Sequence, residues 1–191
     1  MYNAKKGFWL SGSVTPFVGG DNTGSGAQLV GEGRIYRSVM KDEKLTFAAR
    51  GRAGTVLGPD ILEVLPDYLF LEGGGGSVRG HSYESLGFEI PFTFEGDEFE
   101  AFVGGQSMVN VSFEARYQVR PKIGAVAFID AAQIWDEGAW DGNTLWQAGA
   151  GVGVRYDTPI GPIRMDVATP INPQDNDSSR VQLYLGLGQA F

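Results

Sequence analysis

Two stretches of this chain alternate apolar and polar residues with a strict period of two. In residues 109–119 every odd position is apolar or aromatic and every even position is polar. Residues 181–188 repeat the pattern, with Val, Leu, Leu and Leu separated by Gln, Tyr and Gly. Successive side chains of a β-strand point to opposite faces, so each stretch predicts a strand with one face in an apolar medium and the other in water. Such strands need hydrogen-bonded neighbours, which restricts the chain to a β-sheet fold.

Six further segments follow the same rule less strictly, at residues 8–17, 28–39, 45–55, 123–131, 148–156 and 163–167. A soluble β-sandwich also alternates in this way. The strand length favours a membrane barrel, because about 9–11 residues suits a tilted bilayer crossing, against roughly 5–6 in soluble sheets. The polar face also carries opposite charges two residues apart, such as Glu114 with Arg116, as a lumen does. We therefore predict an all-β fold, an antiparallel transmembrane β-barrel of about eight strands, with residues 1–191 as one domain.

Composition excludes several classes of function. The chain has 15 basic and 23 acidic residues, a net charge of -8, whereas phosphate binding needs clustered Lys and Arg. We expect no nucleic-acid partner. Without cysteine there is no disulfide, thiol nucleophile or cysteine-ligated zinc, and the single histidine, His81, cannot build a histidine metal site. No nucleophile–base pair is visible either, so we expect no enzymatic activity, no metal and no cofactor.

The connection between the third and fourth strand segments is far longer than the others. It covers residues 56–106, and long connections in compact folds are usually functional or disordered. Its run Gly73–Ser77 reads on its own as a flexible linker. A phosphate-binding loop is disfavoured, because neither a strand-to-helix context nor a Lys-Ser/Thr pair follows it.

Four motifs in this order resemble the BamA/TamA outer-membrane assembly superfamily. They are Ser77-Val78-Arg79-Gly80 after the glycine run, Gly124-Ala125-Val126-Ala127-Phe128-Ile129-Asp130, the stretch from Gly151 to Asp166 that includes Gly-Pro-Ile-Arg-Met-Asp, and a last strand closing on Phe191. The resemblance implies a barrel of sixteen strands preceded by periplasmic POTRA domains, so the eight strands here would be its C-terminal half. Whether these strands close on themselves, pair with a second copy or join a larger barrel stays open.

The resemblance also implies that the long loop folds inward and that Arg79 and Gly80 meet the barrel wall. It places Arg79 against Asp130 and Glu114, with Phe128 beside them. The alternation agrees, since these three wall residues have the even, lumen-facing parity. The alternative is that Asp130 pairs with Arg155 and leaves Arg79 in solvent. The family usually has an aromatic residue where this chain has His81, whose role is either that of an ordinary loop histidine or that of a pH sensor.

By the same resemblance, the last strand is one side of a lateral gate and carries an outer-membrane assembly signal. Its residues are Leu183, Leu185, Gly186, Leu187, Gly188 and the aromatic Phe191. Unpaired strand edges are costly in lipid and can template an incoming strand. Glycine weakens strand pairing locally. This suits a seam, meaning the junction between the last and the first strand of the complete barrel, that opens.

These features together predict an assembly and insertion factor of the bacterial outer membrane. It would act on client barrels such as autotransporters by lateral gating and strand addition. The residues of these motifs are more similar to TamA than to BamA, which implies an inner-membrane-anchored partner of TamB type. Two alternatives remain: a two-partner secretion pore that exports a protein, and the membrane barrel of a patatin-like surface enzyme.

Overall fold

The computed structural model describes residues 4–20, 23–40, 42–94, 97–173 and 180–191. Its main element is an eight-stranded sheet in the order β1-β2-β3-β6-β7-β8-β9-β10, in which all neighbours are antiparallel. The strands are β1 (Lys6–Phe17), β2 (Gly26–Ser38), β3 (Leu45–Leu57), β6 (Ser107–Arg120), β7 (Ile123–Trp135), β8 (Thr144–Thr158), β9 (Gly161–Pro170) and β10 (Gln182–Leu187). Each segment predicted from the alternation falls on one of them, so the prediction of an antiparallel all-β fold is confirmed.

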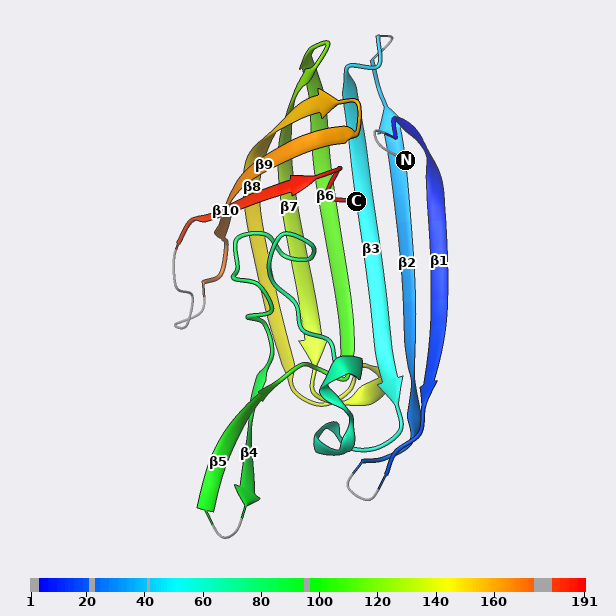
Figure 1. Cartoon of the computed structure of the whole chain (residues 1–191), viewed down its shortest axis with the longest axis vertical. Coiled ribbons are helices and arrows are strands. Elements are labelled where there is room, and N and C mark those ends of the chain that lie inside the picture. The colour runs from blue at the N-terminus through cyan, green and yellow to red at the C-terminus, as the bar shows by residue number, and fades with distance from the viewer. Residues whose placement is uncertain (1–3, 21–22, 41, 95–96, 174–179) are drawn as a thin grey trace.

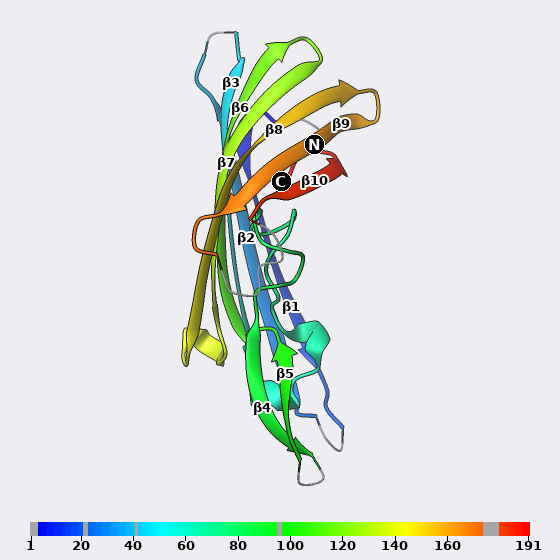
Figure 2. The same cartoon turned by 90° about the vertical axis from the view of Figure 1, so that its left-hand side faces the viewer.

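The sheet is strongly curved, with β1 and β10 at its two edges and the long connection on one side of it (Figure 1, Figure 2). The two faces differ sharply in chemistry. The face away from the connection carries exposed apolar side chains such as Val152 and Leu185. The opposite face carries buried polar and charged side chains such as Asn110 and Glu114. This is the arrangement of a lipid-facing wall around a polar lumen.

The long connection is structured over most of its length. It contains the 3-10 turns η1 (Ile61–Glu63) and η2 (Pro66–Tyr68) and a separate hairpin of β4 (Phe88–Phe94) with β5 (Asp97–Val103). A third turn, η3 (Gly138–Trp140), joins β7 to β8. The hairpin extends beyond the end of the main sheet (Figure 1).

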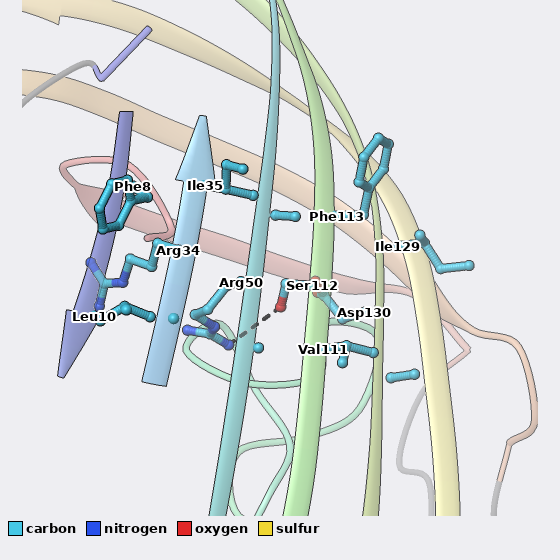
Figure 3. A pocket seen from close by; sticks show the side chains of 14 residues that line it. Phe8, Leu10, Arg34, Ile35, Arg50, Val111, Ser112, Phe113, Ile129 and Asp130 are labelled. Atoms are coloured by element: carbon cyan, nitrogen blue, oxygen red, sulfur yellow. Dashed lines mark hydrogen bonds between the residues drawn. The ribbon is translucent and has the colours of Figure 1, made fainter. Parts of the chain in front are cut away.

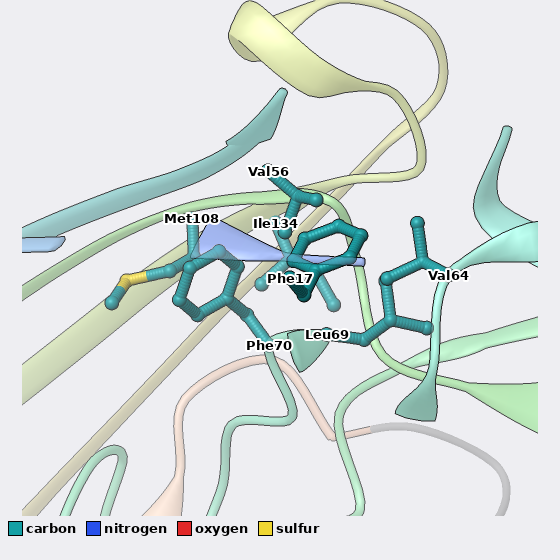
Figure 4. Close-up of a cluster of buried hydrophobic side chains, with 7 residues drawn as sticks. All are labelled: Phe17, Val56, Val64, Leu69, Phe70, Met108 and Ile134. Atoms are coloured by element: carbon teal, nitrogen blue, oxygen red, sulfur yellow. The ribbon is translucent and has the colours of Figure 1, made fainter. Parts of the chain in front are cut away.

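An apolar cluster fastens the start of the connection to the sheet. Its buried members are Phe17, Val56, Val64, Leu69, Phe70, Met108 and Ile134, which come from β1, β3, β6, β7 and the segment around η1 and η2 (Figure 4). Backbone hydrogen bonds between Phe70 and Gly105 close this region, at 2.8 and 2.9 Å. The connection therefore enters and leaves the lumen at a fixed point.

The lipid-facing surface has an apolar depression of about 620 Å³ (Figure 3). Its lining includes Gly33 and Gly51 as well as the larger side chains of Phe8, Ile35 and Phe113. A Cβ atom on Gly51 would meet nothing within 4 Å. The surface of the depression is thus mostly apolar. No helix in the described part of the chain is long and apolar enough to cross a membrane.

A charge placed on the outward face should be costly according to its depth. Val152 lies in the middle of β8 and is 62% exposed, whereas Val119 lies at the end of β6 and is 52% exposed. We expect Val152→Arg to lower the free energy of unfolding from lipid vesicles by about 2–4 kcal/mol, and Val119→Arg by roughly 0–1 kcal/mol. Chemical denaturation in vesicles measures both. Equal small losses would mean that this face does not lie in hydrocarbon.

Candidate functional site

The tip loop, defined as residues 72–86, folds back onto the polar face of the sheet. Its base is closed by two backbone hydrogen bonds between Glu72 and Leu86, at 3.0 and 3.2 Å. Gly73 and Gly74 have φ angles of +107° and +92°, which residues other than glycine rarely adopt. The Ser77 hydroxyl accepts from the Gly73 amide at 2.6 Å. The glycine run is therefore part of a compact turn in this structure and not an extended linker.

Arg79 extends from the tip loop into a cluster of three buried carboxylates. Its Nε and Nη2 donate to the two oxygens of Asp130 on β7, at 2.7 and 3.0 Å. Its Nη1 donates to Glu114 Oε1 on β6 at 2.6 Å and lies 3.4 Å from Asp166 Oδ2 on β9. The side chain is 2% exposed. A planar guanidinium suits this geometry because it can grip one carboxylate with two hydrogen bonds and still reach a second.

Phe128 and the Arg79 backbone complete the contact. The guanidinium carbon lies 3.4 Å from the centre of the Phe128 ring, and the Arg79 amide donates to Asp130 at 3.2 Å. Burial alone would lower the pKa of Arg79, but the hydrogen bonds and charges of Asp130 and Glu114 outweigh it and raise the pKa above its ordinary value. Arg79 is therefore a permanent cation in this site.

Two arginines of the barrel wall form ion pairs with Glu114 and Asp166. Arg116 on β6 donates to Glu114 Oε2 at 2.7 Å, and Arg155 on β8 binds both oxygens of Asp166. Arg155 therefore does not pair with Asp130, in contrast to the alternative considered from the sequence. Among the described residues, the carboxylate of Asp130 accepts hydrogen bonds from Arg79 alone. The result is a dense ion-pair network that holds a loop in place.

The structure thus brings four of the predicted residues, Arg79, Glu114, Phe128 and Asp130, into direct contact. Gly80 lies beside them with a φ of +111°, and a Cβ atom there would overlap the carbonyl group of Thr169 on β9. The sequence placed Arg116 beside Glu114 on the polar face, but it did not predict how Arg116, Arg155 and Asp166 join the ion-pair network, nor that Tyr184 contacts the loop. All four have the inward parity of their strands, and Asp166 ends the Gly-Pro-Ile-Arg-Met-Asp motif, so parity was the available signal.

The last strand is shorter than expected. Leu183, Leu185 and Leu187 are exposed on the outward face, and Gly186 faces inward beside Arg164. Gly188 lies beyond β10 with a φ of +89°, which turns the chain out of the strand. The expectation that the strand runs to Phe191 is therefore wrong. Phe191 is buried on the inner side against Tyr36 and Ala48, and its carbonyl oxygen accepts from Arg116 at 3.2 Å.

His81 is completely buried beside the network. Its Nε2 lies 3.2 Å from the carbonyl oxygen of Ala148 on β8. This position is that of a packed wall contact and not of a solvent-exposed loop residue. In the part of the chain that the structure describes, no group of three or more His, Asp or Glu side chains could hold a metal ion.

Glu72 anchors the tip loop at a second point, away from Arg79. Its carboxylate is 1% exposed and accepts from Asn110 Nδ2 on β6 at 2.9 Å, while the nearest cation, Arg52 Nη1 on β3, is 3.8 Å away. Burial raises the pKa of Glu72, against the opposing effects of the Ser77 hydroxyl and of Arg52. The loop base is thus held by a carboxyl group that takes up a proton more readily than usual.

Docking of the tip loop should therefore weaken as pH rises. A carboxyl whose pKa is raised in the docked state stabilises docking fully below its undocked pKa, and this stabilisation is lost as pH rises through the docked pKa. We expect faster hydrogen exchange of the loop amides at pH 8 than at pH 4, after correction for the intrinsic rate. Glu72→Gln should remove this pH dependence, and Glu84→Gln, at an exposed position in the same loop, should keep it. If the Glu72→Gln variant kept the same pH dependence, a titratable group other than Glu72 would be its cause.

Comparison with known proteins agrees with this geometry. A family model described as the Omp85 superfamily domain matches residues 1–191, the whole chain. The crystal structure of BamA from Haemophilus ducreyi lacking POTRA domains 1-3 is similar, with a TM-score of 0.74 and 24% sequence identity. The match covers 93% of this chain and 38% of that one. The chain therefore spans well under half of the length of that BamA.

Proposed function

Because the chain belongs to the Omp85 superfamily, we propose that it helps to assemble and insert other β-barrel proteins. Its location is the bacterial outer membrane, in keeping with its family and its lipid-facing wall. No step in this activity requires bond chemistry in the chain. The work is done by exposing a strand edge and by adding a client strand to it.

The observation that carries the proposal is the last strand of the sheet. β10 has six residues, whereas β8 has fifteen, and it pairs with β9 alone among the described strands. Its outward row of leucines belongs in lipid, where unpaired backbone groups are costly. A client strand that hydrogen-bonds to this edge would satisfy those groups. The edge is thus suited to the temporary capture of an incoming strand.

The docked tip loop suits the same function. Its ion-pair network joins β6, β7 and β9 on the inner face, near the strand that would open. We propose that this loop holds β6, β7 and β9 in their positions while β10 separates from one neighbouring strand and pairs with a client strand. The more specific features suggested by the sequence, clients of the autotransporter class and a TamB-type partner, belong to this proposal and rest on the TamA-like motifs alone.

Reconstitution separates this function from a secretion pore. The full-length protein in liposomes should accelerate the folding of an added client barrel into a heat-modifiable, protease-resistant form, compared with empty liposomes. A pore of the two-partner type would instead move a soluble passenger into the vesicle and leave barrel folding unchanged. That second pattern would reject the proposed function.

A further inference from the structure

The inner side of β10 is attached to the tip loop. An edge strand has ladder hydrogen bonds on one side only, so other contacts contribute more to its position. Residues 183, 185 and 187 point outward, which leaves the inward residues to make those contacts. Tyr184 is the largest inward residue of the strand.

The Tyr184 hydroxyl bridges two backbone groups of the loop. It donates to the carbonyl oxygen of His81 at 2.7 Å and accepts from the amide of Gly80 at 2.9 Å. These groups directly follow Arg79 in the chain. The phenol therefore binds the same segment that the carboxylates hold from the other side.

Neighbouring contacts support the phenol. A Cβ atom on Gly75 would come within 3.1 Å of the Tyr184 ring, so the absence of a side chain there gives the ring its place against the loop. The amide of Gln182 lies 3.3 Å from the hydroxyl of Ser82, one residue further along the loop. On β9, Arg164 Nη2 donates to the Gly75 carbonyl at 3.2 Å. The loop thus touches both strands at this edge of the sheet.

We propose that Tyr184 is a positioning residue that transmits the docked state of the tip loop to the edge strand. Arg79 fixes the loop on β6, β7 and β9, and the phenol fixes β10 on the loop. When the loop withdraws, the Tyr184 hydroxyl loses these two backbone partners, and β10 loses its hydrogen bonds to the loop. The consequence for client insertion rests on the proposed function, whereas the coupling itself does not.

Hydrogen exchange of the full chain in lipid nanodiscs tests this coupling. Tyr184→Phe keeps the ring and removes the hydroxyl, and we expect about tenfold faster exchange of the β10 amides with β6 and β8 unchanged. The matched control is Tyr156→Phe on β8, whose ring is exposed on the outward face. It should leave β10 unchanged. Heat-modifiable migration on gels checks that each variant is folded.

The role of the loop requires a second variant. Arg79→Lys keeps the charge but loses the two-pronged grip on Asp130, and it should accelerate exchange in β10 as well as in the loop. Adding Tyr184→Phe to Arg79→Lys should then accelerate β10 no further. Unchanged β10 exchange in either single variant, or additive acceleration in the double variant, would overturn the coupling. Faster β10 exchange with normal client insertion would keep the coupling and reject the proposed role of the seam.

Discussion

Replacing Arg79 with alanine is expected to free the tip loop and leave a folded barrel of reduced stability. Asp130 is 1% exposed and would keep no cation, whereas Glu114 would keep Arg116 and Asp166 would keep Arg155. Removing one partner of a buried ion pair costs about 3–5 kcal/mol, because the other charge stays buried. The loss should appear as rapid hydrogen exchange throughout residues 72–86 and as an earlier denaturation midpoint.

A second substitution distinguishes the two effects of Arg79→Ala. Adding Asp130→Asn removes the buried unpaired charge, so the denaturation midpoint should recover in part. The loop should stay undocked, because its guanidinium is still missing. If the loop amides of the double variant were again fully protected from exchange, Arg79 would not be the residue that holds the loop. If the denaturation midpoint did not recover, the unpaired charge of Asp130 would not be the cause of the lost stability.

The second large effect is expected at a glycine of the wall. Gly149 on β8 lies directly under the tip loop, and a Cβ atom there would overlap the carbonyl oxygen of Arg79. A backbone atom cannot swing aside as a side chain can, so Gly149→Ala should displace the loop tip at a cost of about 1–3 kcal/mol. We expect loop amides to exchange nearly as fast as in Arg79→Ala, although every charged residue of the site is intact.

Gly51→Ala is the matched control for this change. Gly51 also lies within a strand, but a Cβ atom there meets open space on the outward face. We expect no change in loop exchange and a stability equal to or slightly above that of the unmodified chain. Equal disturbance by both substitutions would indicate a general effect of strand glycines and not contact with the loop.

The sequence predicted the strands well because a lipid-facing strand must alternate along its whole length. The same rule assigned the inner parity of Glu114 and Asp130 correctly. The hairpin of β4 and β5 was overlooked, although Phe88, Ile90 and Phe92 alternate with other residues, because the segment was treated only as part of a long loop. Its strands are seven residues each, too short for the length criterion.

Other features depend on distances that no pattern encodes. Asp166 and Tyr184 are far from Arg79 in sequence, and only the curvature of the sheet brings them to the tip loop. Phe191 was misplaced because the family resemblance extended the last strand to the C-terminal aromatic residue, whereas a positive φ at Gly188 ends the strand. Parity gives the face of a residue, but the partner on that face follows from the fold.

The account as a whole depends on the opening of the sheet beside β10. The most direct measurement uses the full-length protein with a pair of introduced cysteines that form a disulfide between β10 and the strand that closes the barrel against it; the 191 residues of this chain add no other cysteine. In liposomes, the oxidised protein should fail to accelerate the folding of a client barrel, and reduction should restore the acceleration. Equal acceleration by the oxidised and reduced forms would contradict strand addition at this seam.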